Sequence, residues 1–211
     1  MESAIAGLYA SAPEPLGFAP SLHARAFLLR RDRGNLIIYS VSHLDLDALQ
    51  SLGGVSRQYL NHRHEAGLAS DQVGVPLFVH ERERESVEET LHVRGTFSRR
   101  HTLDDDFEVI PTPGHTKGTT AYLWDSGQHR FLFTGDTVFL KHGEWVAAVL
   151  GSSDVGPYVE SLEQIRELDF DVLVPWIASE DQPYYAVTSK ADTRRRVDAI
   201  LKRVLAEHAA T

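Results

Sequence analysis

Hydrophobic positions along the chain fall into short runs separated by glycine, proline and charged residues, which is typical of a protein rich in strands. Residues 24–30 and 35–41 are two such runs, and the Asp-Arg-Gly sequence between them predicts a β-hairpin. A helical pattern opens at Asp45 and stops before two glycines, so we expect a short helix there. Residues 55–62 then predict the next strand.

The middle of the chain contains most of the remaining strand-like runs. A short helical stretch is expected after residue 64, and residues 81–106 are charged and irregular, which indicates edge strands and surface loops. Apolar runs bounded by glycine, proline or aspartate predict strands in the segments 76–80, 107–115, 119–125, 130–136 and 138–149.

The last third of the chain contains two longer helical patterns. Residues 157–168 place apolar side chains on one helical face, with a proline near the first turn, and residues 189–208 repeat this pattern over a longer stretch. A strand is expected between them at 171–177. Helices with one apolar face need a sheet to cover, so the pattern predicts an α/β (α+β) fold with packed sheets and outer helices. No repeat or linker divides the chain, and we expect a single domain over residues 1–211.

Charge narrows the classes of partner. The formal net charge of −9 repels phosphate backbones and anionic lipid surfaces, so neither nucleic acid nor a membrane is expected as a partner. The first residues lack a basic segment followed by a long apolar one, and a cytoplasmic location is therefore the expectation. The sequence leaves the oligomeric state open, with a homodimer among the options.

The candidate chemistry lies in histidine and aspartate, because the chain has no cysteine. His62 and His64 stand two apart at the exit of an expected strand, where both rings would point to the same face. Such a pair by itself is equally consistent with two hydrogen-bonded surface histidines.

Two later stretches add a third histidine and an aspartate. The first stretch is PTPGHTKGTT, in which a Pro-Gly turn directly after an expected strand presents His115. The second stretch is FLFTGDT, in which an apolar strand ends in a glycine that lets Asp136 project from the sheet edge. Each has a plainer interpretation: the first as a simple turn, the second as a capping carboxylate. The three stretches in this order are a more specific pattern than any one of them.

Taken together, these stretches resemble the signature of the metallo-β-lactamase-fold superfamily, which has an HxHxDH motif, a PGHT-like turn, a TGD-type strand end and a last histidine. The resemblance implies a four-layer αββα sandwich of two mixed β-sheets with helices on the outer faces. It also implies a metal site made by His62, His64, His115 and Asp136, in which Asp136 is a ligand or holds the attacking water and is the catalytic residue.

The departures from that signature affect only the second of the family's two metal sites. Ala66 and Gly67 stand where the first motif should end in Asp and His, and Trp176 and Ile177 stand where the last histidine should follow its strand. The resemblance therefore implies one zinc ion per chain, with iron or manganese as alternatives. Other polar residues near expected strand ends are weaker candidates for completing a second site: Glu65, His80, His142, Glu180 and Asp181.

A zinc ion held by three histidines with an open position lowers the pKa of a bound water to about 7, which favours hydrolysis. The resemblance thus implies a mononuclear metal-dependent hydrolase using a metal-activated water on a small ester, lactone, thioester or phosphoester-type substrate. The alternative is a degenerate, non-catalytic member of the family that acts as a metal- or ligand-binding scaffold. We take the enzyme as the working hypothesis.

Overall fold

Strands from the first half of the chain form one mixed sheet. In the computed structural model, which describes residues 1–69, 73–180 and 182–208, this sheet has seven strands. Its pairings are antiparallel from β1 to β6 and parallel from β6 to β9. The strand order is β1 (Glu2–Ile5), β2 (Leu8–Ala10), β5 (Phe27–Leu29), β6 (Leu36–Ile38), β7 (Arg57–Tyr59), β8 (Leu77–His80) and β9 (Val93–Phe97).

A second mixed sheet packs against the first. Among its pairings, β13 with β16 is parallel and the others are antiparallel. Within the described residues its order is β10 (His101–Leu103), β11 (Phe107–Pro111), β12 (Thr120–Asp125), β13 (Arg130–Gly135), β16 (Val172–Pro175) and β18 (Ala186–Val187).

A smaller, five-stranded sheet lies beside these two and was not expected from the sequence. It joins the N-terminal hairpin to the C-terminal half of the described chain through the antiparallel pairing of β17 with β4. Its order is β15 (Glu144–Val146), β14 (Phe139–Lys141), β17 (Ile177–Ser179), β4 (Ala19–Ala24) and β3 (Glu14–Leu16).

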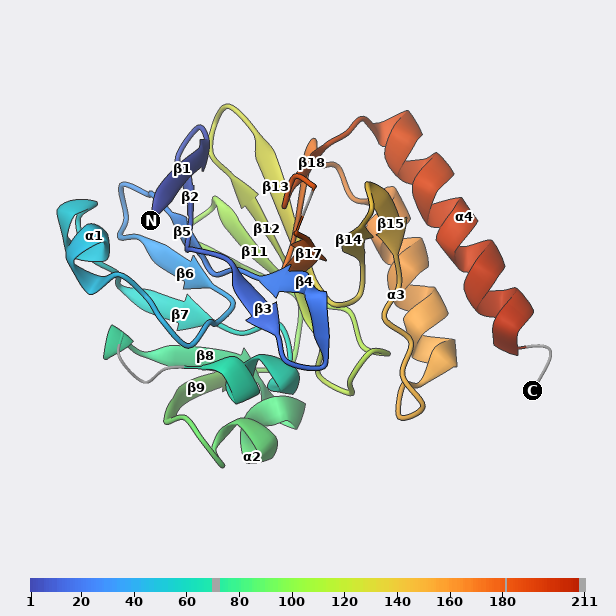
Figure 1. Cartoon of the computed structure of the whole chain (residues 1–211), viewed down its shortest axis with the longest axis horizontal. Helices are drawn as coiled ribbons and strands as arrows, with labels where there is room; N and C mark the ends of the chain where they lie inside the picture. Colours follow the sequence, from blue (N-terminus) through green and yellow to red (C-terminus); the bar gives the residue numbers. More distant parts are fainter. Residues whose placement is uncertain (70–72, 181, 209–211) are drawn as a thin grey trace.

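Alternation of side chains along the strands builds the layers. On β12, Tyr122 and Trp124 point into the core between the two large sheets, whereas Ala121 and Leu123 point to the helices behind the second sheet. The helices α3 (Val155–Glu167) and α4 (Lys190–His208) cover that outer face and lie side by side in Figure 1. None of the helices in the described ranges has the length and apolarity needed to cross a bilayer.

The outer face of the first sheet is covered by shorter helical elements. Leu77 and Val79 on β8 pack with Ala66 and Val87, which belong to the 3-10 helix η1 (Arg63–Leu68) and to α2 (Arg84–Val87). The other short elements are η3 (Glu81–Glu83) and α1 (Leu46–Ser51), whose N-cap Asp45 accepts a hydrogen bond from the Ala48 N–H. The four-layer αββα sandwich with outer helices is thereby confirmed.

Three local predictions differ from the structure. The segment 81–106 supplies the expected edge strands β9 and β10, but it also contains η3 and α2, whose charged residues lie on exposed faces except for the buried Glu83. The expected strand 171–177 is wrong as one element: the chain leaves the second sheet after Pro175 and enters the small sheet at Ile177. Residues before 24, for which the sequence pattern predicted no element, form β1 to β4.

Candidate metal centre

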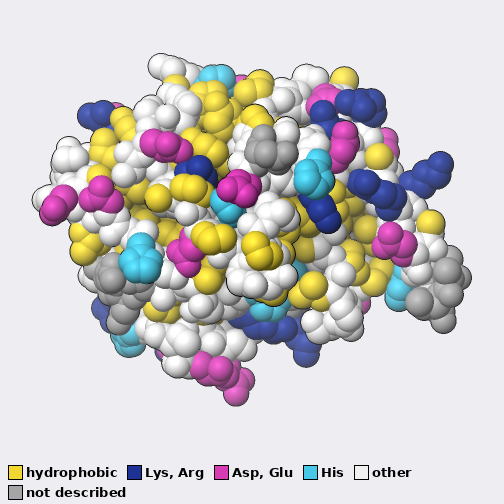
Figure 2. All heavy atoms as spheres, in the orientation of Figure 1, with side chains coloured by type: hydrophobic (Ala, Val, Ile, Leu, Met, Phe, Trp, Pro, Cys, Tyr) yellow, Lys and Arg dark blue, Asp and Glu magenta, His cyan; other side chains and the backbone are white. Residues whose placement is uncertain are grey.

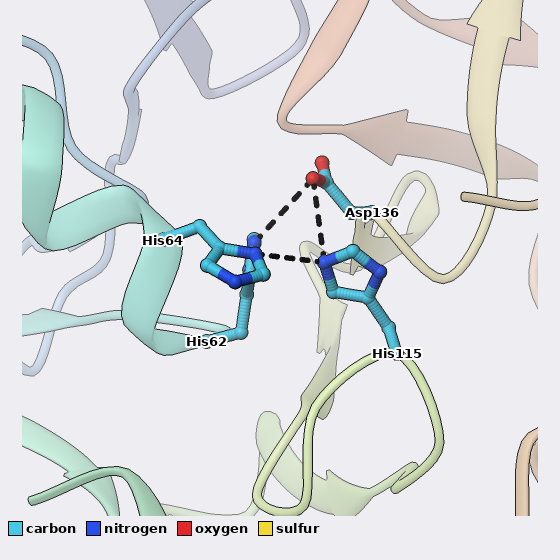
Figure 3. A group of neighbouring side chains, drawn as sticks. All are labelled: His62, His64, His115 and Asp136. Atoms are coloured by element: carbon cyan, nitrogen blue, oxygen red, sulfur yellow. Dashed lines mark hydrogen bonds and ion pairs between the residues drawn. The ribbon is translucent and has the colours of Figure 1, made fainter. Parts of the chain in front are cut away.

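Four side chains from three loops converge at one edge of the sandwich. His62 and His64 follow β7, His115 follows β11, and Asp136 follows β13 (Figure 3). One ligand atom from each lies within 4.8 Å of the ligand atom of every other. The structure therefore brings together all four residues for which the sequence implied a common site; that they hold an ion remains a prediction.

We had expected the two histidines of the first motif at the end of a strand, with both rings on the same face. In the structure they do not lie on a strand. β7 ends at Tyr59, His62 is the extended residue before η1, and His64 lies inside that 3-10 helix. The turn sets the two rings nearly perpendicular, with centroids 5.0 Å apart and an interplanar angle of 88°. Their convergence thus depends on the start of η1, not on the alternation of side chains along a strand.

Glu65 fixes the start of this helix. Its carboxylate accepts hydrogen bonds from the N–H groups of Asn61 and His62, at 2.9 Å and 3.1 Å, and lies 3.1 Å from Nδ1 of His62. Glu65 is fully buried. Because Nδ1 of His62 faces an acceptor, that nitrogen carries a hydrogen, and Nε2 is the nitrogen that faces the centre of the cluster.

His115 is placed by a tight turn against α3. Gly114 has a φ of 137°, and a Cβ at that position would collide with the backbone of Tyr158. Nδ1 of His115 lies 2.7 Å from the carbonyl oxygen of Ala148, to which it donates. Nε2 is consequently left without a hydrogen and points toward the cluster.

Asp136 projects from a strand end that is held by Tyr39. The hydroxyl of Tyr39 accepts a hydrogen bond from the Gly135 N–H at 2.8 Å and donates to the Val174 carbonyl at 2.7 Å. Gly135 has a φ of 55°, and a Cβ there would overlap the side chain of Asn61. Only glycine fits this turn, which explains why the carboxylate follows a glycine at the strand end.

The distances and the unpaired atoms fit a cation. Nε2 of His115 lies 3.1 Å from Nδ1 of His64 and 3.6 Å from Oδ2 of Asp136, and Nε2 of His62 lies 3.4 Å from the same oxygen. Nε2 of His62 and Oδ1 of Asp136 are buried, and neither makes a hydrogen bond with any described residue. Three imidazole nitrogens and one carboxylate oxygen are a donor set that suits zinc.

Charge is distributed unevenly within the metal-free cluster. Burial disfavours the charged form of His62, but the carboxylates of Asp136 and Glu65 outweigh it and raise the pKa of His62 to about 10. Burial and the nearby positive charge on His62 lower the pKa of His115 to about 4 and also lower the pKa of His64. The cluster thus holds its proton on His62 and keeps the other two rings neutral.

The positions that depart from the family signature lie beside this cluster. Ala66, Gly67, Trp176 and Ile177 line the same cavity as His64, His115 and Asp136, and its volume is about 870 Å³. The ring of Trp176 stands edge to face against that of His62, with centroids 5.5 Å apart. Apolar side chains therefore occupy the wall where ligands of a second ion would stand.

None of the weaker second-site candidates in the described residues joins the cluster. Glu65 lies on the Nδ1 side of His62, Nδ1 of His80 accepts from the Arg82 N–H, and Glu180 lies 3.9 Å from His23. His142 is exposed next to β14. Asp181 lies outside the described residues.

Sequence reasoning missed the supporting residues Glu65 and Tyr39. The spacing of three between His62 and Glu65 is the spacing of a helix capping pair and could have indicated the role of Glu65. The role of Tyr39 has no local signal, because its partners Gly135 and Val174 are distant in the sequence.

Residues 31–175 match the family model of the metallo-β-lactamase superfamily. The chain belongs to this superfamily, and its four-layer sandwich is the fold described above.

Among curated proteins, a hydroxyacylglutathione hydrolase of Erwinia tasmaniensis is 31% identical over 115 residues, which are 54% of this chain and 43% of that protein. The match thus spans less than half the length of that relative. Among solved structures, the DIM-1 metallo-β-lactamase superposes with a TM-score of 0.72 at 13% identity, covering 96% of this chain and 95% of that one. A metallo-β-lactamase from Pontibacter korlensis has a TM-score of 0.71 at 14% identity and 97% coverage of both chains. These structures show a shared fold.

Proposed function

We propose that this protein is a mononuclear metal-dependent hydrolase acting on a small ester, lactone, thioester or phosphoester-type substrate. The observation that carries the proposal is the convergence of three imidazoles and one carboxylate within 4.8 Å, beside a cavity large enough for a small molecule. His62, His64 and His115 would hold a zinc ion, with iron or manganese as alternatives, and Asp136 would be a fourth ligand or would hold the attacking water.

A bound divalent ion would polarise the reacting carbonyl or phosphoryl oxygen and make water a better nucleophile near neutral pH. Asp136 would orient that water: its Oδ2 faces the histidines, while its buried Oδ1 has no hydrogen-bond partner among the described residues. A carboxylate in this position can accept the proton that the water loses. The apolar cavity wall at Trp176 and Ile177 would limit bulk water around the reacting group.

A single ion is supported by the side chains at the second-site positions. Ala66 and Gly67 offer no ligand atom, and Trp176 commits its indole N–H to the Ser40 carbonyl at 2.9 Å. The similarity to a hydroxyacylglutathione hydrolase supports an acyl compound as the substrate. The net charge of −9 favours a small molecule over nucleic acid or an anionic membrane as the partner, and we propose a cytoplasmic location.

A binding scaffold without turnover is the second candidate. It is favoured by the same departures, because a two-metal relative uses those positions to place its nucleophile. The two candidates differ in turnover, and the scaffold would bind either a metal or another ligand at this site.

Metal content and a substrate panel test the proposal. Purified protein should contain about one zinc, iron or manganese ion per chain. The variant His115→Ala should lose this ion, whereas the variant His92→Ala should retain it, because His92 is exposed on the surface. A panel of esters, lactones, thioesters and phosphodiesters should show turnover that a chelator abolishes and zinc restores. Absence of bound metal contradicts the hydrolase and the metal-binding form of the scaffold, leaving only a ligand-binding scaffold, and metal without any turnover favours the scaffold.

A further inference from the structure

We propose that the space beside Trp176 and Ile177, where a two-metal relative would place a second ion, is a compartment for an apolar acyl group of the substrate. This inference rests on the proposed hydrolase function, since the acyl carbonyl must reach the histidine cluster. The inference adds to that function a class of substrate, namely esters, lactones or thioesters of medium-chain apolar acids.

The first argument is the chemistry of the wall nearest the cluster. Trp176 and Ile177 are buried and line the cavity next to Asp136 and His115. The only polar atom of the Trp176 side chain donates to the Ser40 carbonyl, so the indole offers carbon atoms to the cavity. A wall of this kind binds hydrocarbon and disfavours a hydrated cation.

The second argument is that the apolar lining continues outward from this wall. Leu16, Phe18 and Leu22, from the β3–β4 hairpin, line the same cavity, as do Phe139 and Leu150. Hydrophobic side chains are exposed on the face that carries this hairpin (Figure 2). Phe18 is 88% exposed and Leu150 is 43% exposed, so neither is held by packing inside the fold. Exposed apolar groups are typical of interaction surfaces, and here they continue a buried apolar wall inside one cavity, which is the setting of a ligand-binding groove.

The third argument is that the lining has one polar side. Arg63, Ser86, Glu89 and Thr90 line the cavity from η1 and the region of α2. The polar part of a substrate would lie on this side, and the acyl group would lie against the hairpin and Trp176. At about 870 Å³ the cavity has room for far more than an acetyl group.

Binding of straight-chain alcohols to the metal-free protein tests the compartment without any turnover. Calorimetric titration with butanol, hexanol and octanol should show affinity rising by up to about fourfold per added methylene, with a negative heat-capacity change. Ile177→Ser should flatten this dependence. Phe18→Ser provides a second probe that cannot disturb the core, because Phe18 is exposed, and it should weaken octanol binding more than butanol binding. Leu205→Ser, on the exposed side of α4, is the control and should bind like the wild type.

Turnover by the zinc-loaded protein supplies the second measurement. With nitrophenyl esters of acetate, hexanoate and decanoate, kcat/KM should rise with chain length, and Phe18→Ser should reduce this rise. Alcohol affinity that is independent of chain length, or unaffected by both substitutions, overturns the compartment even if short esters are hydrolysed. Chain-length-dependent binding with no turnover of any ester, lactone, thioester or phosphodiester supports the compartment and contradicts the proposed hydrolase.

Discussion

Nε2 of His62 lies 3.4 Å from Oδ2 of Asp136, although the two residues follow strands of different sheets. In the metal-free cluster this carboxylate keeps a proton on His62 and holds its pKa near 10. Two of the four candidate ligands are therefore already an ion pair. A cation that binds Nε2 must displace this proton, since a protonated nitrogen has no lone pair to offer.

Zinc binding near pH 7.5 should accordingly release about one proton per chain, and zinc affinity should rise with pH. Calorimetric titration in two buffers of different ionisation enthalpy measures the released proton directly. Asp136→Asn is the informative comparison, because loss of the carboxylate lowers the pKa of His62 and should reduce the number of protons released. Equal binding enthalpies in both buffers for the wild type would refute the prediction.

Glu65→Gln should weaken zinc binding about 10- to 100-fold while preserving the fold, because the amide oxygen can still accept from the backbone but no longer stabilises the His62 ring as a carboxylate does. Competition with a chromophoric chelator measures the zinc Kd. Glu89→Gln is the matched control, because Glu89 is an exposed carboxylate that lines the same cavity. Loss of zinc affinity equal in both variants would indicate a general charge effect and count against a positioning role for Glu65.

His115 should reduce the stability of the metal-free protein in acid. Its pKa is about 4 in the folded state and about 6.5 in an unfolded chain, so between these pH values the unfolded state binds more protons. The contribution of His115 to the free energy of unfolding should then fall by about 1.4 kcal/mol per pH unit, at most, as the pH is lowered through this window.

Urea denaturation of wild type and His115→Gln at several pH values between about 4 and 7 isolates this contribution. The comparison between variants is needed because Glu65 also titrates in this range. Burial raises the pKa of Glu65 to about 6, against the opposing effect of His62. Below that pH, protonation of Glu65 makes the folded state more stable as the pH falls, whereas protonation of His115 in the unfolded chain makes it less stable. Parallel pH profiles for the two proteins would show that His115 is not the cause.

Tyr39→Phe should destabilise the metal-free protein by about 1–3 kcal/mol, because it leaves the Gly135 N–H and the Val174 carbonyl buried without their partner. Chemical denaturation measures the loss. Tyr185→Phe is the control, since the Tyr185 hydroxyl makes no hydrogen bond with a described residue, and it should change stability by less than about 0.5 kcal/mol. A near-neutral Tyr39→Phe would mean that water replaces the hydroxyl at the strand end.

Local sequence determined the elements with strong periodicity and clear ends. The hairpin of β5 and β6, the helix after Asp45, and the helices α3 and α4 lie where the pattern of apolar residues predicted them. The same holds for the turns that carry His115 and Asp136, because PGHT and TGD are contiguous motifs whose glycines have the backbone angles that their turns require. Periodicity and turn chemistry depend on neighbouring residues, so they can be read from the chain directly.

Tertiary structure decided how those elements combine. Residues 171–177 read as one apolar strand, yet the chain changes sheets at Trp176, because β13 pairs with β16 while β4 and β14 pair with β17. That change of sheet turns an apolar run into the wall of the cavity. The placement of Tyr39 against Gly135, and of Trp176 against His62, likewise depends on contacts between distant segments. The packing of the whole sandwich determines which distant strands pair, and no local sequence pattern indicates this pairing.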